Sequence, residues 1–436
     1  MSSEWTFAPL ESCLEALIDY RGKTPEKTDS GIPLITAKII KRGRIEKATE
    51  FIAEDNYASW MRRGIPKEGD IVLTVEAPLG EVAQLGSEKI ALAQRVVTLR
   101  GKEGVLDNTY LLYLLQTEEM LEQLKARATG TTVLGIKQSE LRKVPLSLPP
   151  IAQQRSAASI LKTLDDRLTL LRETNATLEA IAQALFKAWF VDFDPVRAKA
   201  EGLEPEGLDA ATAGLFPDSF EESELGLVPM GWKAGCVADI AVQKKGSVNP
   251  LASPNEWFEH YSLPAFDSGQ SPVLEHGESI KSNKTPLPEE VVLLSKLNPH
   301  IPRVWLPVKH GKNAVCSTEF LAYSPKAGGS KELIYCLFSS AEFQQQLCQL
   351  VTGTSNSHQR VKPDQVLKLR LAIADDSLFI AFADIASPIF ERVYANRLKA
   401  KTLTQLRDAL LPRLISGQLR LPETEASIEN MLSEAV

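Results

Sequence analysis

The sequence predicts an α+β protein in which a globular block followed by a long helix occurs twice. Between residues 151 and 190, apolar or small residues recur at alternating steps of three and four, a spacing that turns one stripe of a helix toward a partner helix. Pro149 and Pro150 come directly before this segment, where a helix can begin but cannot extend backwards. A helix of that length needs a second helix against its stripe.

The second helix lies in the same chain, because the sequence repeats itself. A shift of 225 residues aligns the first helix with residues 385–415 without a gap. The block before each helix repeats too, since the tripeptide TGT occurs at 129–131 and 352–354, and residues 136–146 match residues 361–371. Self-similarity of this kind marks a chain built from repeated structural units.

A chain of 436 residues is too long for a single core, whereas two globular units with connecting helices account for its length. The repeat and the shifts in composition predict six segments. They are a first globular α/β block at 1–150, a central helix at 151–190, an acidic linker at 191–230, a second globular α/β block at 231–375, a C-terminal helix at 376–420 and an acidic tail at 421–436.

The stripes of the two helices are expected to pack against each other. The stripe residues are Leu161, Leu164, Leu168, Leu171, Asn175, Leu178 and Leu185 in the first helix, and Ile389, Val393, Leu403 and Leu410 in the second. Asn175 would help to fix the register, unless it is exposed or acts as a cap. Pro388 and Pro412 predict a second helix that is shorter, kinked or less tightly packed. The tract at 178–190 is apolar enough to meet another subunit as well.

The formal net charge of −7 conceals an uneven distribution. Residues 191–230 hold ten acidic and two basic residues, and residues 421–436 hold four acidic residues and no basic one. Without these twelve negative charges the remainder of the chain carries +5, so binding to nucleic acid is admissible. The chain has no apolar run of 18 residues and no signal peptide, and we expect a soluble cytoplasmic protein.

Several polar turns are suited to contacts with phosphate oxygens and base edges, although each residue could equally be an ordinary solvated loop residue. In the first block the candidates are Lys38, Lys41, Arg42, Arg44, Arg63, Thr131 and Lys137. In the second block they are Lys281, Ser282, Asn283, Lys284, Lys296, Asn298, Arg303, Ser355, Asn356, His358 and Arg360. The candidates of the two blocks differ, which is typical of two readers with different targets.

Catalytic motifs are missing from the sequence. Gly22-Lys23-Thr24 lacks the earlier glycine of a phosphate-binding loop, because residue 17 is leucine. There is no G-x-S-x-G, H-E-x-x-H or G-x-G-x-x-G motif. All five histidines lie in the second block, so the repeats cannot share a histidine-based mechanism. We expect neither catalysis nor a metal site in this chain.

Two stretches carry a resemblance to a known family. They are TGTTVLGIKQSELRKVPLSLPPIAQQRSAASILKTLDDRLTLLRETNATLEAIAQALFKAWFVDFDPV and its echo, TGTSNSHQRVKPDQVLKLRLAIAD followed by IFERVYANRLKAKTLTQLRDALLPRLISGQL. Both strongly resemble the specificity subunit of type I restriction-modification enzymes. SIKSNK, LSKLNP, STEF and GTSNSHQRV resemble a recurrent recognition domain of that family, so the resemblance covers nearly the whole chain.

The resemblance implies two pseudo-repeated target recognition domains, whose long spacer helices pack as an antiparallel coiled coil. Such a subunit is not an enzyme and reads a bipartite, asymmetric sequence in double-stranded DNA, one half-site per domain. Its helices dock two modification (methyltransferase) subunits, and restriction (translocase/nuclease) subunits join the complex. S-adenosylmethionine, ATP and magnesium are then expected on those partners. Two alternatives remain. One is a stand-alone restriction or modification enzyme, for which the N-P-P-[YF] motif and a helicase phosphate loop are missing here, and the other is a coiled-coil scaffold without DNA specificity.

Overall fold

The computed structural model describes residues 5–22, 24–352 and 359–419. Its internal contacts divide the chain into two compact units. Unit 1 comprises Met1–Leu170 and Lys399–Val436, and unit 2 comprises Leu171–Leu398. Each unit therefore contains a globular block together with a part of each long helix, which agrees with two repeated α/β blocks and two helices.

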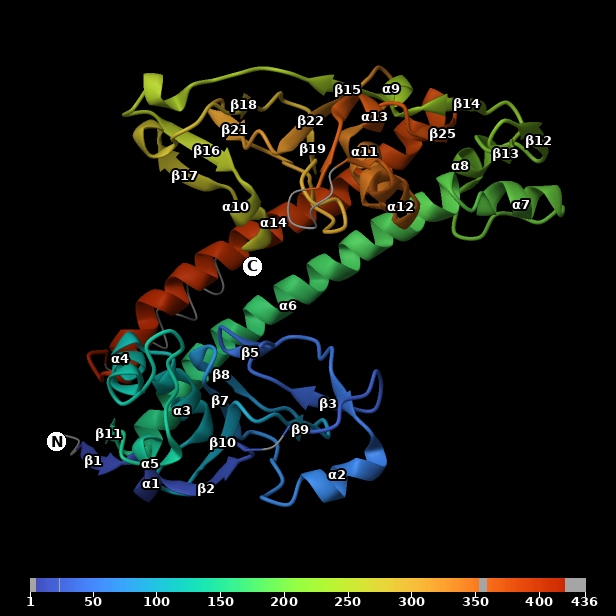
Figure 1. Ribbon diagram of the computed structural model, residues 1–436. Coiled ribbons are helices and arrows are strands. Elements are labelled where there is room, and N and C mark those ends of the chain that lie inside the picture. The colour runs from blue at the N-terminus through green and yellow to red at the C-terminus, as the bar shows by residue number, and fades with distance from the viewer. Residues whose placement is uncertain (1–4, 23, 353–358, 420–436) are drawn as a thin grey trace. The chain divides into compact units, whose positions relative to one another are not determined.

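The core of unit 1 contains a four-stranded antiparallel sheet with the strand order β2-β10-β7-β8. Helices α3 and α4 pack against β7 and β8 (Figure 1). Each begins at a capping side chain: Asp107 accepts from the Tyr110 N–H, and Thr117 accepts from the Met120 N–H. The bounds are β2 Leu14–Asp19, β7 Ile71–Val75, β8 Leu79–Gln84, β10 Val96–Gly101, α3 Asn108–Leu115 and α4 Glu118–Ala126.

Shorter elements complete unit 1. A second sheet has the order β6-β3-β9, and β4-β5 and β1-β11 form two-stranded sheets. Their bounds are β1 Thr6–Pro9, α1 Leu10–Cys13, β3 Ile32–Ile35, β4 Ile40–Lys41, β5 Arg44–Ile45, β6 Phe51–Ile52, α2 Glu54–Trp60, β9 Ala91–Leu92, α5 Gln138–Leu141 and β11 Pro145–Leu148.

Unit 2 repeats the main sheet, with the order β15-β22-β19-β20 and antiparallel pairing throughout. The registers correspond as well: Val96 faces Thr74 between β10 and β7, and Phe320 faces Ser295 between β22 and β19. Helices α11 and α12 stand where unit 1 has α3 and α4, and α11 packs against β19, β20 and β22. The bounds are β15 Ala241–Lys244, β19 Val292–Ser295, β20 Val304–Trp305, β22 Phe320–Pro325, α11 Lys331–Ser339 and α12 Ala341–Gln349.

A second sheet in unit 2 has the order β17-β16-β21-β18, and β14-β25 and β23-β24 form two-stranded sheets. The β14-β25 pair repeats β1-β11, and α9 and α13 repeat α1 and α5. The bounds are β14 Lys233–Cys236, α9 Val237–Ile240, β16 Trp257–Tyr261, α10 Leu263–Asp267, β17 Val273–His276, β18 Thr285–Pro286, β21 Ala314–Cys316, β23 Val351–Thr352, β24 Arg360–Val361, α13 Pro363–Val366 and β25 Arg370–Ile373, with short 3-10 turns at Pro250–Ala252 and Gly277–Ser279.

The two long helices have equal length. Helix α6 spans Ile151–Phe190 and α14 spans Asp376–Ile415, 40 residues each. The second helix is therefore not shorter, although Pro388 and Pro412 lie within it. A proline removes one backbone donor, and the buried residues on either side of Pro388, Phe382 and Phe390, hold this part of the helix in the core of unit 2.

Within unit 2 the segments of α6 and α14 run antiparallel. Asn175 contacts Asn396, Phe186 contacts Phe382 with ring centroids 6.0 Å apart, and Phe190 contacts Phe379 at 5.7 Å. The residue number on α14 falls as that on α6 rises, which confirms the antiparallel packing expected from the resemblance. Trp189 is also buried here, so much of the apolar surface at 178–190 is used inside unit 2.

The acidic segment 191–230 is folded. It contains α7 Asp194–Ala200, α8 Ala210–Gly214 and the hairpin of β12 Phe220–Ser223 with β13 Gly226–Pro229. Val196, Phe216 and Val228 are buried, and Phe216 meets Trp189 edge to face at 5.1 Å. The segment therefore packs on the core of unit 2. Its acidic side chains lie among the exposed residues of a folded surface, and among the described residues no helix is long and apolar enough to cross a membrane.

Candidate nucleic-acid interface

In unit 1 a basic turn between β4 and β5 is fixed to strand β8. Arg42 has a positive φ of 49°, and its backbone N–H donates to Glu81 Oε2 at 2.7 Å. The next residue, Gly43, forms a bridge with Ala83 of β8. The side chains of Lys38, Lys41, Arg42 and Arg44 are exposed, and Lys41 pairs with Glu46 at 2.7 Å. The contacts with β8 thus fix the backbone of the turn, which presents the cationic side chains at the surface.

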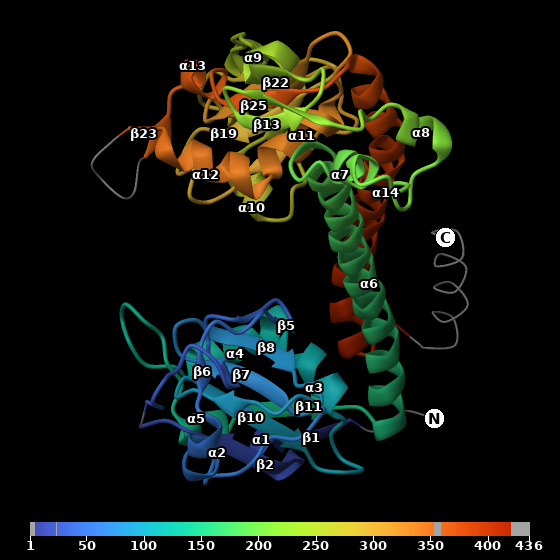
Figure 2. The same ribbon diagram turned by 90° about the vertical axis from the view of Figure 1, so that its right-hand side faces the viewer.

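A loop at residues 129–135, which joins α4 to α5 (Figure 2), is anchored at the end of β7. The backbone N–H groups of Thr129 and Gly135 each donate to the other residue's carbonyl, at 2.9 and 3.0 Å. Gly135 also pairs with Glu76 at the end of β7, and the Ile136 N–H donates to the Val75 carbonyl at 3.0 Å. The candidates Thr131 and Lys137 are exposed in and beside this loop.

The turn and the loop lie at the same end of the β7-β8 hairpin. Glu81 accepts the Arg42 N–H, and its own N–H donates to Thr74 Oγ1 at 2.9 Å. Thr74 is two residues before Glu76, which pairs with Gly135 of the loop. Two residues of strand span about 7 Å. The structure therefore brings the basic residues 38–44 and the loop 129–135 together on one edge of unit 1, which we call reading edge 1.

Unit 2 has the corresponding edge at the end of β19. The Val361 N–H donates to the Lys296 carbonyl at 3.0 Å, and Leu297 forms a bridge with Arg360. Asn298 has a φ of 49°, and Ala77 at the equivalent point of unit 1 has a φ of 51°. Lys296 and Asn298 therefore lie in the turn after β19, and Arg360 lies beside it on β24 and pairs with Glu319 at 3.0 Å. Ser355, Asn356 and His358 lie outside the described residues.

Three of the candidates contact other groups of the protein. Lys284 is only 7% exposed and donates to Ser282 Oγ at 2.6 Å, and burial lowers its pKa. Arg303 binds both carboxylate oxygens of Asp267, at 2.7 and 2.9 Å. Arg63 donates from Nη1 to the carbonyl oxygens of Asp19 and Arg21. These contacts hold the side chains of Lys284 and Arg303 against the protein, whereas Arg63 remains exposed.

The other candidates of unit 2 sit in the loop before β18. Lys281, Ser282 and Asn283 are exposed. Lys281 donates to the Glu278 carbonyl at 2.6 Å, and Asn283 donates to Ser247 Oγ at 3.2 Å. The loop is therefore ordered by local contacts and keeps its polar side chains at the surface.

The helix stripe is buried most deeply near the start of α6. Leu161, Leu164 and Leu168 are fully buried in unit 1, and Leu171, Asn175, Leu178 and Leu185 are half-buried in unit 2. On α14 the stripe residues Val393, Leu403 and Leu410 are buried and Ile389 is half-buried.

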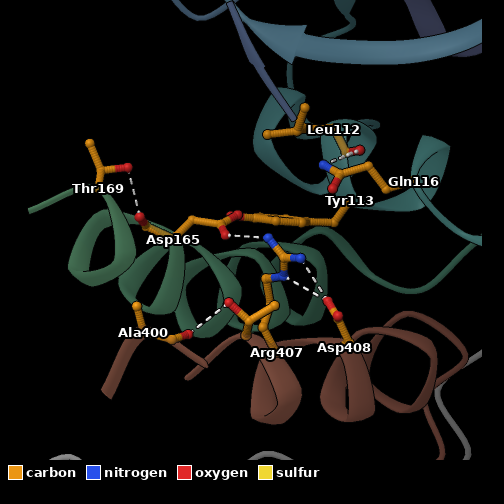
Figure 3. A network of polar contacts seen from close by, with 9 residues as sticks. Leu112, Tyr113, Gln116, Asp165, Thr169, Ala400, Arg407 and Asp408 are labelled. Atoms are coloured by element: carbon orange, nitrogen blue, oxygen red, sulfur yellow. Dashed lines mark hydrogen bonds and ion pairs between the residues drawn. The ribbon is translucent and has the colours of Figure 1, made fainter. Parts of the chain in front are cut away.

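A polar clasp joins the two helices of unit 1 to its globular block, and sequence reasoning missed it. The Tyr113 hydroxyl of α3 donates to Asp165 Oδ2 of α6 at 2.9 Å, and Arg407 Nη1 of α14 donates to Asp165 Oδ1 at 2.9 Å (Figure 3). Arg407 also pairs with Asp408 at 2.7 Å. Burial, with the charge of Asp165, raises the pKa of Tyr113, so its hydroxyl stays protonated and can donate.

The repeat shift of 223 to 225 residues places Cys336, Phe390 and Ala182 at the clasp positions of unit 2. All three are buried, and Cys336 lies 4.0 Å from the Ala182 carbonyl. Phe390 stacks edge to face on Tyr335 at 5.0 Å. The same position is thus polar in unit 1 and apolar in unit 2.

A pair of asparagines occupies the helix interface of unit 2. Asn396 is 2% exposed and donates from Nδ2 to Asn175 Oδ1 at 2.8 Å, and Asn175 donates to the Val393 carbonyl at 3.4 Å. Asn175 is therefore neither a cap nor an exposed residue. Asn396 was visible in the sequence as a polar residue on the second stripe, but its partner could be identified only from the antiparallel register.

Replacing Asn396 by leucine is expected to lower the free energy of unfolding by about 1 kcal/mol, because the amide of Asn175 loses its partner while remaining half-buried. Replacing both asparagines by leucine is expected to recover that loss, since no polar group is then left unpaired. Urea unfolding of the two single variants and the double variant gives the coupling energy. A double variant as unstable as the sum of the singles would contradict a direct pair.

Comparison with known proteins finds one matching family model. Residues 3–180, which include the sheet of unit 1 and its reading edge, match the type I restriction modification DNA specificity domain. As a whole the chain is similar to type I specificity subunits, which confirms the resemblance noted from the repeated TGT segments and helices.

Two curated relatives extend the similarity beyond the matched domain. The MjaIX specificity subunit of Methanocaldococcus jannaschii is 26% identical over 413 residues, which cover 92% of this chain and 90% of the relative. The HindI specificity subunit of Haemophilus influenzae is 26% identical over 381 residues, covering 76% and 82% respectively. Both relatives are named as specificity subunits of type I restriction enzymes.

A solved structure supports the fold. The S subunit of a type I restriction-modification system from M. genitalium has a TM-score of 0.54 to this chain at 16% identity, and covers 95% of this chain and 96% of its own. The α+β fold with two globular domains and long helices is therefore that of type I specificity subunits.

Proposed function

We propose that this protein is the DNA sequence-recognition subunit of a type I restriction-modification complex and reads a bipartite, asymmetric target. The observation that carries the proposal is the pair of reading edges, built at equivalent ends of β7 and β19 from different residues. Equivalent backbones place side chains in the same way in each unit. Different side chains on them then select a different base sequence in each half-site.

The charges near reading edge 1 suit this role. Lys38, Arg42 and Arg44 are exposed beside the loop at 129–135, so cationic groups that can contact phosphates lie next to side chains that can reach bases. Phosphate contacts position a protein on the duplex, and base contacts specify the sequence. The acidic surface of residues 191–230 carries none of the candidate residues. The charge of −7 is therefore compatible with a local basic surface.

The partners of the complex are part of the proposal. Two modification subunits would dock on the long helices, restriction subunits would join them, and S-adenosylmethionine, ATP and magnesium would bind those partners. The complex would work in the cytoplasm, where the DNA lies. A coiled-coil scaffold without DNA specificity is the second candidate, and it is less favoured because the curated relatives bear the name of specificity subunits.

The test is to co-express the chain with the modification subunit encoded beside it and to map methylated adenines in the host DNA by single-molecule sequencing. We expect a split motif with a constant gap. A complex that forms but methylates no split motif would contradict the proposed function, and a failure to form any complex would favour the scaffold.

Exchanging residues 1–150 for the corresponding block of a homologous subunit supplies the matched control. Only one half of the motif should change, because reading edge 1 lies entirely within those residues. A change in both halves would contradict one half-site per unit.

A further inference from the structure

Two apolar residues at the tip of the loop at 129–135 have no role in the core of unit 1. Val133 is 48% exposed and Leu134 is 39% exposed. Ile136, the residue directly after the loop, is only 1% exposed and anchors the loop in the core. The chain therefore places one apolar residue inside and presents two others side by side at the surface.

The conformation of this loop is built into the sequence. Gly130 has a φ of 118°, and a Cβ atom there would lie 2.1 Å from the Val133 carbonyl oxygen. Only glycine allows this approach, so Gly130 lets the chain fold back across the tip. The paired backbone of Thr129 and Gly135 closes the loop behind it. Val133 and Leu134 are thus presented on a defined backbone.

The chemistry of the surroundings points to DNA. Reading edge 1 combines this apolar tip with the exposed cations of the β4-β5 turn. Glu81, which anchors the turn, donates to Thr74, and Thr74 is two residues from Glu76, which anchors the loop. In the major groove the thymine C5-methyl group is the apolar feature that proteins contact, while Lys and Arg bind the flanking phosphates. An apolar tip beside a basic turn fits that pattern.

The repeat argues against a docking site for a modification subunit. The loop equivalent to 129–135 lies at 352–360 in the sequence, is two residues longer and reads TGTSNSHQR, so Ser, Asn and His replace Val and Leu. Two copies of the same partner would be met by similar residues at equivalent positions. Dissimilar tips are expected where each tip reads a different half-site.

We propose that Val133 and Leu134 recognise thymine methyl groups in the half-site read by unit 1. This inference rests on the proposed function, because it names the chemistry that one reading edge selects. A methylated adenine in each half-site guarantees at least one thymine on the complementary strand. The tip then supplies the apolar part of recognition, and the residue pair determines specificity without taking part in methyl transfer.

The test compares duplexes in which each thymine of the first half-site is replaced in turn by uracil, which pairs identically but lacks the methyl group. The reconstituted complex is expected to methylate at least one uracil duplex about fourfold more slowly per lost methyl contact. The variant Val133→Ser with Leu134→Ser is expected to lose that preference, so that it methylates the thymine duplex and the uracil duplex at equal rates. Thymine-to-uracil changes in the second half-site should affect both proteins equally.

Two further variants control for the fold. Gly130→Ala keeps the tip residues but displaces them, and is expected to lose the same preference. Val105→Ser alters an exposed apolar residue of unit 1 outside the reading edge and should retain it. A thymine preference that survives the serine variant would overturn the inference while leaving the proposed function intact. Loss of the modification subunit from the purified variant complex would also overturn it, because the tip would then be a protein-docking site. If the unaltered chain yields no split motif, the proposed function itself fails.

Discussion

Replacing Arg100 by alanine is expected to lower the free energy of unfolding of unit 1 by about 3 kcal/mol. Arg100 donates from Nε and Nη2 to the two oxygens of Asp70, at 2.8 and 2.7 Å, and this contact raises the pKa of the guanidinium. Asp70 is 1% exposed. The Lys67 N–H also donates to Asp70 Oδ2 at 2.8 Å, but this contact carries no charge, so the variant leaves a buried carboxylate without its counter-charge.

Urea unfolding followed by a probe in unit 1 measures this loss. Lys102→Ala is the matched control, because Lys102 is an exposed cation two residues further along the chain. Asp70→Asn combined with Arg100→Ala should recover part of the stability, since no charge then stays buried. Equal effects of Lys102→Ala and Arg100→Ala would contradict a specific role for the buried pair.

Replacing Arg407 by alanine is expected to destabilise unit 1 by about 2 kcal/mol, less than the Arg100 variant because the Arg407 side chain is 20% exposed and that of Asp165 is 30% exposed. Asp165 would keep the Tyr113 hydroxyl but lose the only cation bonded to it among the described residues. The C-terminal part of α14 would then be held mainly by its apolar stripe. Water reaching Asp165 would compensate some of the loss.

Thermal unfolding and hydrogen exchange along α14 test this expectation. Exchange should accelerate around Arg407 in the Arg407→Ala variant and remain unchanged in Arg413→Ala, which removes an exposed arginine of the same helix. Tyr113→Phe should have a smaller effect, because it removes one neutral donor and leaves the ion pair in place. Unaltered exchange in Arg407→Ala would show that the clasp does not fasten the helix.

The apolar periodicity of the sequence was sufficient to predict the first long helix, and its internal similarity was sufficient to predict the second helix and the repeat. Steps of three and four gave the bounds of α6 at 151–190, because a buried stripe constrains a long helix strongly. Pro412 and Pro388 were misleading for the length of α14, because a proline removes only one hydrogen bond and tertiary packing outweighs that loss. Local propensity alone cannot weigh these two effects.

Side-chain partners were the part that the sequence could not supply. Lys284 and Arg303 have the same residue types as phosphate ligands, yet Ser282 and Asp267 bind them. Asp267 is 36 residues from Arg303 along the chain, so only the folded chain brings that pair together. Val133 is the opposite case: it has no polar group, so its residue type did not indicate a contact with DNA. Its exposure on a loop closed by backbone hydrogen bonds, rather than its residue type, identifies it.

The unlike clasps imply that the two halves of the gene are no longer interchangeable. In a chain that carried the first half twice, alanine, as at Ala182, would replace Arg407. The Asp165 carboxylate would then face no cation. A chain that carried the second half twice would place arginine, as at Arg407, in the position of Ala182, facing the buried Phe390 and no carboxylate. Recombination that creates new specificities is therefore tolerated best when it exchanges the globular blocks and leaves each helix with its matched block surface.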